Sequence, residues 1–450
     1  MLFLSVLLVK PVKAQTNSVP DHPLTQAPKK TTSGGGWNWW KNRFQAEMDY
    51  LDRTNYWGNS TTQLPKGLLG IKYSCNFVQG GDQWDMKGHS MGGVLPLIDG
   101  DFGSMGAIRL DPKATGGAVF HQVQVSYGIT DAWDVYVKIP FMHLNVKLDP
   151  MYESRGVASA LFGNTLEDFY KTIEKFGRPR PQKHYETHGV EMADIDFGVS
   201  WQYYRSKYFA GSLTGRIYAP TGRLANPDRM IYTLLGPELD AGKGGWGLGF
   251  SAAFDVRMPI PRNILKYIDI ILSGEVDFQQ RFPYHRRFPH FTKPDYSSIA
   301  SWGTDAVSGI KSFFPDVSED AGRQYTVYPG SIFGLMSSVQ FNIYRALSLT
   351  VEYDYIAVMP SIVKGLHAAA DQMMGSTLFA GGATEHHLQF GVATGALFAL
   401  SIPLRLTAKY EIMFAGTNTM PLTHNWTFGI EMYLPIAMPD EEALKKAKAN

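Results

Sequence analysis

The segment Gly88–Gly92 has the G-x-S-x-G spacing with which serine hydrolases place a nucleophilic serine on a sharp turn between a strand and a helix. That chemistry requires a buried strand before Ser90 and a helix after it. The preceding residues Asp82–Lys87 are polar and Pro96 follows soon afterwards, so neither element is expected. We therefore interpret the motif as a glycine-rich loop. A membrane hydrolase that uses His121 is also disfavoured, because no serine lies two residues further on.

Two histidine pairs have spacings that could suit a metal. His184 and His188 are four residues apart, but prolines just upstream oppose the rigid helix that a zinc pair needs. His386 and His387 point to opposite faces if they lie on a strand. The run Gly242–Gly245 precedes a strand rather than a helix, which does not support a phosphate cradle. We therefore predict no catalytic residues, no metal site and no cofactor.

A larger polar set consists of charged residues at alternate positions in otherwise apolar segments. Both signs occur, with acids in excess. If these segments are the strands of a barrel, the charged side chains share its inner face. Two interpretations stay open: a network of ion pairs that braces the wall, or a polar conduit that disfavours anions. The lumen-lining candidates are Asp134, Lys138, Asp194, Asp196, Arg216, Asp255, Arg257, Asp269, Glu275, Asp277, Glu352, Asp354, Arg405, Lys409 and Glu411.

The clearest structural pattern that could position such residues is a hairpin at residues 117–143. Val123, Val125 and Tyr127 alternate with polar residues, and the alternation restarts at Trp133 after a short polar turn. Since strand side chains alternate between faces, two half-apolar strands joined by a tight turn are expected. Each apolar row is about as long as the roughly 9–11 residues with which a tilted strand crosses a bilayer.

The same alternation recurs along the chain, and short connections alternate with long ones. An up-and-down barrel with short periplasmic turns and long outer loops requires this order. We therefore predict an all-β fold, a closed antiparallel transmembrane β-barrel of about twelve strands in the outer membrane of a Gram-negative cell, with fourteen as the alternative count. The competing fold is a soluble all-β protein. The expected strands are 69–77, 117–129, 133–141, 193–203, 209–219, 246–258, 268–279, 333–343, 347–355, 388–396, 402–412 and 425–434.

Composition limits other classes of function. Of 450 residues only 18% are charged and the net charge is +1, which gives no reason to expect nucleic acid as a partner. No apolar run reaches the ~18 residues of a spanning helix. Cys75 is the single cysteine, so no intrachain disulfide can form and stability must come from a large fold.

The predicted organisation has four parts. Residues 1–14 contain a short apolar core and an A-x-A-like site at Val12-Lys13-Ala14, which is typical of a signal peptide. Residues 15–65 begin as a flexible tether and become aromatic from Trp37; they either plug the lumen or lie in the periplasm. Residues 66–434 form the barrel. Residues 435–450 form a charged periplasmic tail.

Three of the long connections change to a helical period, with apolar residues at steps of three and four; in the third, at residues 362–373, the period is weaker. We expect short amphipathic helices on the extracellular side. Two interpretations stay open: a structural lid in which each helix packs its apolar stripe over the barrel mouth, or an apolar capture surface for a greasy or aromatic solute. The capture candidates are Phe162, Leu166, Phe169, Ile173, Ile299, Trp302, Ile310 and Phe313.

The order of several short motifs suggests a family. The chain resembles, over residues 64–434, the outer-membrane transporter family of the MetA pathway of phenol degradation. This resemblance implies passive uptake or export of small, often aromatic or hydrophobic, molecules. The family is more distantly similar to long-chain fatty acid transporters, whose N-terminal segment plugs the lumen. The motifs that carry the resemblance are Leu64–Gly67, Tyr127–Asp131, Trp133–Val135, Ile139–Phe141, Asp194–Gly198 and Ala219–Gly222.

Taken together, these patterns predict a non-enzymatic outer-membrane channel for passive passage of small hydrophobic or aromatic molecules. Its expected partners are outer-membrane lipid and the solute. The alternative is a barrel that transports nothing and acts as a surface scaffold or adhesin through its long loops. The sequence leaves the oligomeric state and the direction of transport open.

Overall fold

The structure is a computed structural model of the chain. The expected signal peptide, most of residues 15–65, the Ser90 motif and most of the C-terminal tail lie outside the described residues. The residues that the structure describes are 61, 64, 66–80, 98–101, 106–111, 114–180, 184–186, 189–206, 208–224, 226–228, 230–232, 236–237, 241–258, 268–302, 304–343, 347–375, 382–394, 404–417 and 422–436.

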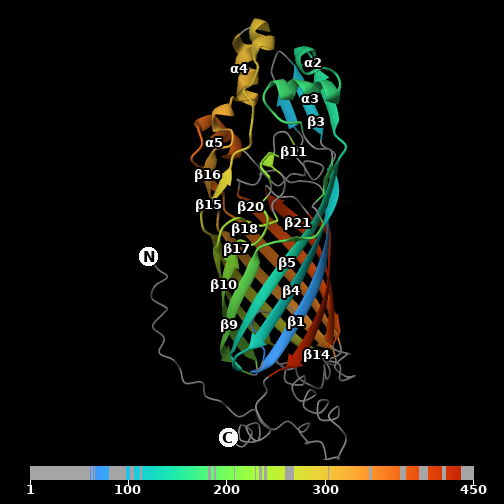
Figure 1. The fold of residues 1–450 in the computed structure, drawn as a ribbon. Coiled ribbons are helices and arrows are strands. Elements are labelled where there is room, and N and C mark those ends of the chain that lie inside the picture. Colours follow the sequence, from blue (N-terminus) through green and yellow to red (C-terminus); the bar gives the residue numbers. More distant parts are fainter. Residues whose placement is uncertain are drawn as a thin grey trace, which may run out of the picture.

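Twelve of the described strands form one closed antiparallel barrel (Figure 1). Neighbours in the chain are neighbours in the wall, and the pairing of β1 with β22 closes it. Each expected strand overlaps one of the twelve, so the predicted fold and count are confirmed. The strands are β1 (Leu68–Gly80), β4 (Ala114–Gly128), β5 (Trp133–Leu148), β9 (Ile195–Arg205), β10 (Phe209–Ala219), β13 (Gly247–Arg257), β14 (Ile268–Arg281), β17 (Ile332–Ile343), β18 (Leu347–Val358), β20 (Ala383–Thr394), β21 (Leu404–Thr417) and β22 (Leu422–Pro435).

Two short strands explain why a count of fourteen is also natural. The strands β7 (His184–Glu186) and β8 (Glu191–Met192) both pair with β5, above the point where β5 stops pairing with β9. They lengthen the sheet beside β5 but are too short to span the membrane. The barrel itself therefore stays at twelve strands.

Side chains alternate between the two faces of the wall as the sequence pattern requires. On β13, Phe250 and Phe254 are 51% and 47% exposed, whereas Ser251 and Asp255 are 3% and 2% exposed. The apolar row therefore faces outward and the polar row faces inward, the reverse of a water-soluble sheet. In lipid every backbone polar group must find a partner within the protein, and a closed barrel provides it. The fold is that of an outer-membrane barrel of a Gram-negative bacterium. No helix in the described part of the chain is long and apolar enough to cross a membrane.

Aromatic residues gather where the short turns lie. In the turn after β4, the Thr130 hydroxyl accepts hydrogen bonds from the amides of Ala132 and Trp133 at 3.2 and 3.0 Å. The rings of Trp133 and Trp201 stack on neighbouring strands with centroids 5.4 Å apart. Tyr204 and Tyr208 are exposed beside the next turn. Amphipathic rings at this level match a membrane interface.

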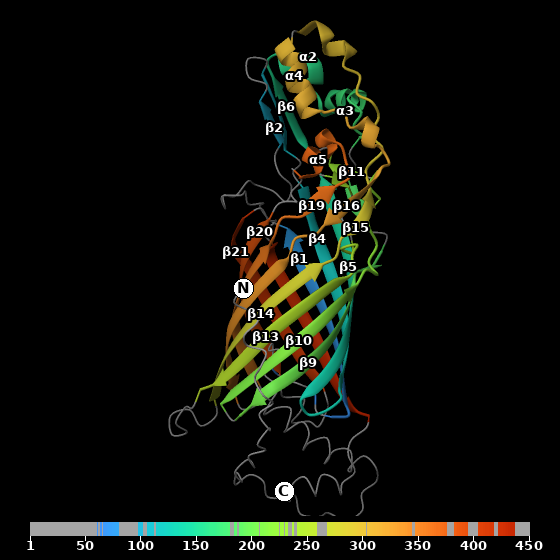
Figure 2. The same cartoon turned by 90° about the vertical axis from the view of Figure 1, so that its left-hand side faces the viewer.

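The long connections build two further layers at the opposite end, which faces outside the cell in bacterial barrels. The more distant layer, here called the head, stands clear of the wall (Figures 1 and 2). It combines a three-stranded sheet with helices, and its elements come from three different connections. The elements of the head are β2 (Ile98–Asp101), β3 (Ala107–Asp111), β6 (Met151–Arg155), α2 (Val157–Phe162), α3 (Leu166–Lys175), η2 (Ser297–Trp302) and α4 (Thr304–Phe313).

The second layer, here called the lid, lies between the barrel rim and the head (Figure 2). A helix was expected over residues 362–373, but Ile362 begins a strand of the lid sheet and the helix starts only at Ala368. The strand forms because residues 362–364 pair with β16 of another connection, a partner that local periodicity does not reveal. The elements of the lid are β15 (Tyr284–Arg287), η3 (Ser318–Asp320), β16 (Gln324–Tyr328), β19 (Ile362–Lys364) and α5 (Ala368–Gly375).

The orientation of the wall gives a first testable prediction. Val199 is 44% exposed in the middle of β9, on the lipid-facing row. We expect Val199→Arg to lower the free energy of unfolding by about 2–4 kcal/mol, because it places a charge near the membrane midplane. The measurement is a urea titration of the protein folded in liposomes. Val199→Leu is the matched control, and equal unfolding midpoints for the two variants would contradict the assigned face.

Candidate functional site

The candidate site is the polar inner face of the barrel. Of the lumen-lining candidates, Asp134, Asp194, Asp196, Asp255, Glu352 and Arg405 are buried, and the others lie half-buried on the same inward rows. The side chain of Asp269 is outside the described part. The structure therefore brings these residues to one surface, although they come from seven different strands and, for Asp194, from the residue before β9. It places them in three groups, which differ in how their charges are balanced.

The first group is a set of ion pairs within the wall. Lys138 Nζ lies 3.7 Å from Asp196 Oδ2 on the neighbouring strand. Arg216 on β10 pairs with Asp277 on β14, reaching across β13 between them. The Arg216–Asp277 pair links three neighbouring strands. Each of its two charges would be unpaired in a confined interior without the other. These contacts favour the bracing interpretation for this part of the wall.

The second group is acidic and surrounds His387. Its ring nitrogen Nδ1 lies 2.6 Å from Glu411 Oε1, and Nε2 lies 3.1 Å from Glu385 Oε2. On the neighbouring strands, Lys409 Nζ lies 3.3 Å from Glu352 Oε1. The amide of Gln389 donates a hydrogen bond to Asp354 in the same group. The carboxylates of Glu352, Asp354, Glu385 and Glu411 outnumber the cationic groups, so this side of the lumen carries net negative charge.

Sequence analysis found only part of this acidic group. It placed His386 and His387 on opposite faces, and this is confirmed: His387 is 3% exposed on the inside, whereas the ring of His386 contacts Tyr353 on the outside. It did not include Glu385. The alternation on β20 was a usable signal for that residue, because position 385 shares the face of position 387.

The third group lies at the rim near the long loops and is centred on Asp194. Its carboxylate accepts hydrogen bonds from the amides of Gly222 and Lys243, at 3.0 and 2.9 Å, and from Arg281 Nη1 at 2.8 Å. The first two donors belong to opposite ends of the connection between β10 and β13. A Cβ atom on Gly222 would come within 2.4 Å of Gly242 Cα, so the two ends approach as only glycine allows. Asp194 therefore fixes the base of this loop to the wall.

Residues just before β1 lie against the inner wall at the short-turn end. The amide of Leu64 donates a hydrogen bond to Asp134 Oδ2 at 3.2 Å, and the side chain of Gln202 donates one to the carbonyl of Thr61. Thr61 is fully buried and Leu64 is 8% exposed. The described residues before β1 therefore lie on the lumen side of the barrel wall, not on its lipid-facing side. Sequence reasoning had left the path of this segment open.

The expected capture residues do not form an open surface. Phe162, Phe169, Ile173, Ile299 and Ile310 are at most 1% exposed and share one hydrophobic core in the head. Leu166 packs against the same core, and the side chains of Trp302 and Phe313 lie outside the described part. The apolar faces of helices from two different connections pack against each other. This packing removes more apolar surface from water than contact with the polar rim of the barrel would. The capture interpretation is therefore wrong for the five buried side chains.

His121 lies on the outer face of the barrel. Tyr73 OH and His121 Nδ1 are 2.8 Å apart and form a hydrogen bond on this face. The rings also stack, with centroids 6.1 Å apart. The phenol thus occupies one nitrogen of the histidine, which fits a structural role on the lipid-facing wall.

No family model matches the sequence, and no curated protein sequence is similar to it. Among solved structures, the COG4313 outer membrane channel from Pseudomonas putida F1 is 11% identical, with a TM-score of 0.47 over 84% of this chain and 100% of that chain. The NanC porin is 8% identical, with a TM-score of 0.32 over 81% and 100%. A FadL homologue from Pseudomonas aeruginosa is 9% identical, with a TM-score of 0.27 over 82% and 90%. The placement of this chain in a membrane rests on its own wall, which is closed, apolar outside and polar inside.

The Asp194 group gives a second prediction. Replacing Arg281 by Met leaves the buried Asp194 carboxylate without its ion pair, and we expect the free energy of unfolding to fall by about 3–5 kcal/mol. Arg155→Met is the control, because Arg155 pairs with Glu153 on the exposed surface of the head, where a pair contributes at most about 1 kcal/mol. Urea titration in liposomes measures both variants. A fall in the free energy of unfolding for Arg281→Met no larger than for the control would contradict the stabilising role of the Arg281–Asp194 pair.

Proposed function

We propose that this protein is a passive outer-membrane channel for small molecules. The observation that carries the proposal is the inner face of the barrel, which is lined by charged and polar side chains instead of the dry apolar core that a structural barrel could use. Polar groups placed along a membrane-spanning interior give a solute partners that lipid does not provide.

The nature of the solute is a finer part of the proposal. The family that the sequence resembles suggests small aromatic or hydrophobic molecules. From the acidic group around His387 we further expect cationic or neutral solutes to pass more readily than anions, because a net negative wall repels anions. Aromatic or alkyl solutes that are neutral or carry an amine satisfy both arguments.

Liposome swelling tests the transport proposal directly. We expect faster swelling with small neutral aromatic solutes than with sugars of similar size, and no swelling with liposomes that lack the protein. A second candidate function is a non-transporting surface scaffold, which is favoured by the head, a unit with its own hydrophobic core above the lid. Swelling rates equal to those of empty liposomes for every solute would reject the channel and favour the scaffold.

Charge selectivity is a separate prediction. In a planar bilayer with a salt gradient, the reversal potential should show preference for potassium over chloride. Replacing Glu352 by Gln removes one carboxylate of the acidic group, and a loss of about 0.5 kcal/mol of cation stabilisation corresponds to about a twofold fall in the permeability ratio. Glu153→Gln in the head is the control. An unchanged ratio for Glu352→Gln would exclude this group as the selective part of the lumen.

We also propose that residues 15–65 reach into the lumen from the short-turn end, since Thr61 and Leu64 are already tied to the inner wall. Deleting residues 15–60 leaves these two contacts in place and removes the rest of the segment. If the segment obstructs the lumen, the single-channel conductance should rise. If it lies in the periplasm, the conductance of the deletion variant will equal that of the full chain and this part of the proposal fails.

A further inference from the structure

Three long connections meet in the lid, and they are those after β10, β14 and β18. The second and third contribute the sheet β15–β16–β19 and a small hydrophobic core around Phe288, Phe291, Val317 and Tyr325. The connection after β10 contributes no described residue to this core. Near its end, Gly244 lies so close to the Tyr284 ring that a Cβ atom would come within 2.6 Å of it, and polar contacts tie its earlier part to the lid.

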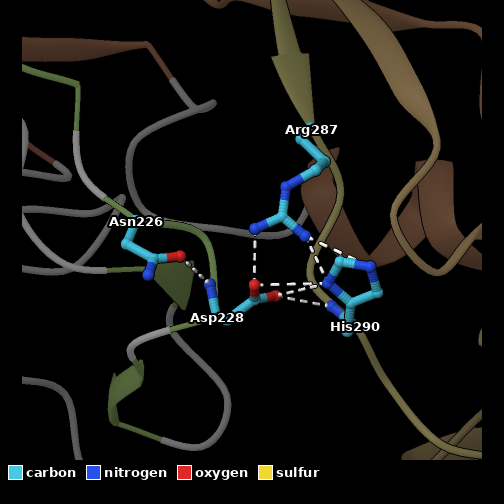
Figure 3. Close-up of polar contacts among 4 residues, drawn as sticks. All are labelled: Asn226, Asp228, Arg287 and His290. Carbon is cyan, nitrogen blue, oxygen red and sulfur yellow. Dashed lines mark hydrogen bonds and ion pairs between the residues drawn. The ribbon is translucent and has the colours of Figure 1, made fainter.

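One cluster attaches it, and Figure 3 shows its geometry. Asp228, on the connection after β10, accepts a hydrogen bond from the amide of His290 at 2.8 Å. The ring nitrogen Nδ1 of His290 lies 3.2 Å from both carboxylate oxygens, and Arg287 forms an ion pair with Oδ2. Asn226 supports the loop by accepting a hydrogen bond from the Asp228 amide at 3.0 Å. We call Asp228, Arg287 and His290 the outer clamp.

A second cluster repeats this arrangement between the next two connections. Asp320 accepts hydrogen bonds from the amide of His367 at 3.0 Å and from Arg323 Nη1 at 3.2 Å. The ring nitrogen Nδ1 of His367 lies 3.0 Å from Asp320 Oδ1. In both clusters one aspartate thus receives a histidine amide, the ring of the same histidine and an arginine. We call Asp320, Arg323 and His367 the inner clamp.

The two clamps are joined by backbone contacts. The amide of Phe288 donates to the carbonyl of Arg323 at 2.8 Å, and the amide of Gly322 donates to the carbonyl of Phe288 at 3.2 Å. Gly322 has φ +71°, and a Cβ atom there would lie 2.6 Å from His290 Nε2. Only glycine allows this approach without strain. The clamps therefore form one continuous link across three connections.

The clamps differ in the burial of their aspartates, and this difference assigns their roles. The Asp320 side chain is 1% exposed and that of Asp228 is 35% exposed, whereas the arginine and histidine side chains are 34–61% exposed in both clamps. Breaking a buried charge pair leaves an uncompensated charge and is costly. An exposed pair contributes little and is screened by salt. The outer clamp therefore opens at much lower cost than the inner clamp.

The pKa of Asp228 favours an ionised carboxylate in the outer clamp. Burial tends to raise the pKa of Asp228, but hydrogen bonds from Arg287 and His290 outweigh it and lower the pKa below its usual value. A depressed carboxyl pKa means that the contribution to stability is present above the ordinary pKa and is lost only as the pH falls through the lower value. The clamp thus keeps its charge at neutral and mildly acidic pH.

We propose that the outer clamp is the releasable latch of an extracellular lid and that the inner clamp is its permanent hinge. Release of Asp228 frees the connection after β10 while the lid sheet and its core stay together. This inference rests on the proposed channel function, because the latch would then control access of solutes to the rim. It does not require the head to move.

Hydrogen exchange tests the latch without any measurement of transport. In Asp228→Asn, we expect the amides of His290, which donates to Asp228, and of residues 230–232 in the released connection to exchange about tenfold faster, since charge-assisted bonds to the clamp are lost. Residues 320–328 should be unchanged. Arg287→Gln should give the same pattern from the other side of the clamp. Glu167→Gln is the matched control, because Glu167 pairs with Arg180 within the head and joins no separate connections.

Channel recordings then test whether the latch gates. Asp228→Asn should raise the open probability, and 1 M salt should do the same for the unmodified chain but not for the variant. Unchanged exchange at His290 and at residues 230–232 in both clamp variants would overturn the latch. Faster exchange with unchanged open probability would overturn its role as a gate. If the unmodified chain and the variant both fail to conduct, the channel proposal fails, and the exchange experiment still decides the latch.

Discussion

The structure depends on one constraint: a backbone that crosses lipid must satisfy its own hydrogen bonds. The chain meets this constraint by pairing its first wall strand with its last, so that the sheet has no free edge within the membrane. Closure fixes which face of every strand points outward. Phe250 and Phe254 can then be exposed without cost, because their surroundings are lipid.

Closure also creates the interior in which charges have to be balanced. Where an acid and a base lie on nearby strands, as with Arg216 and Asp277, they brace the wall. Around His387 the acids are in excess, and the wall is negative there. Ion pairs thus brace one side of the lumen, whereas on the other side the acids outnumber the bases.

The same principle of mutual burial organises the loops outside the membrane. Amphipathic stripes from separate connections bury each other in the head, and a second core holds the lid. The loop after β10 is also held by polar contacts, among them Asp194 at its base, the ion pair of Arg223 with Glu191, and Asp228.

The sequence predicted about twelve wall strands, with fourteen as the alternative, together with their faces and the side that carries the long loops, because strand alternation and connection length are local properties that need no partner. It also indicated which charges face inward. Only the tertiary structure decided which charges meet, that Leu64 lies against Asp134, that the stripe through Phe169 is buried and that residues 362–364 form a strand. Each of these depends on segments far apart in the chain, and periodicity within one segment carries no information about the surface that another will bring to it.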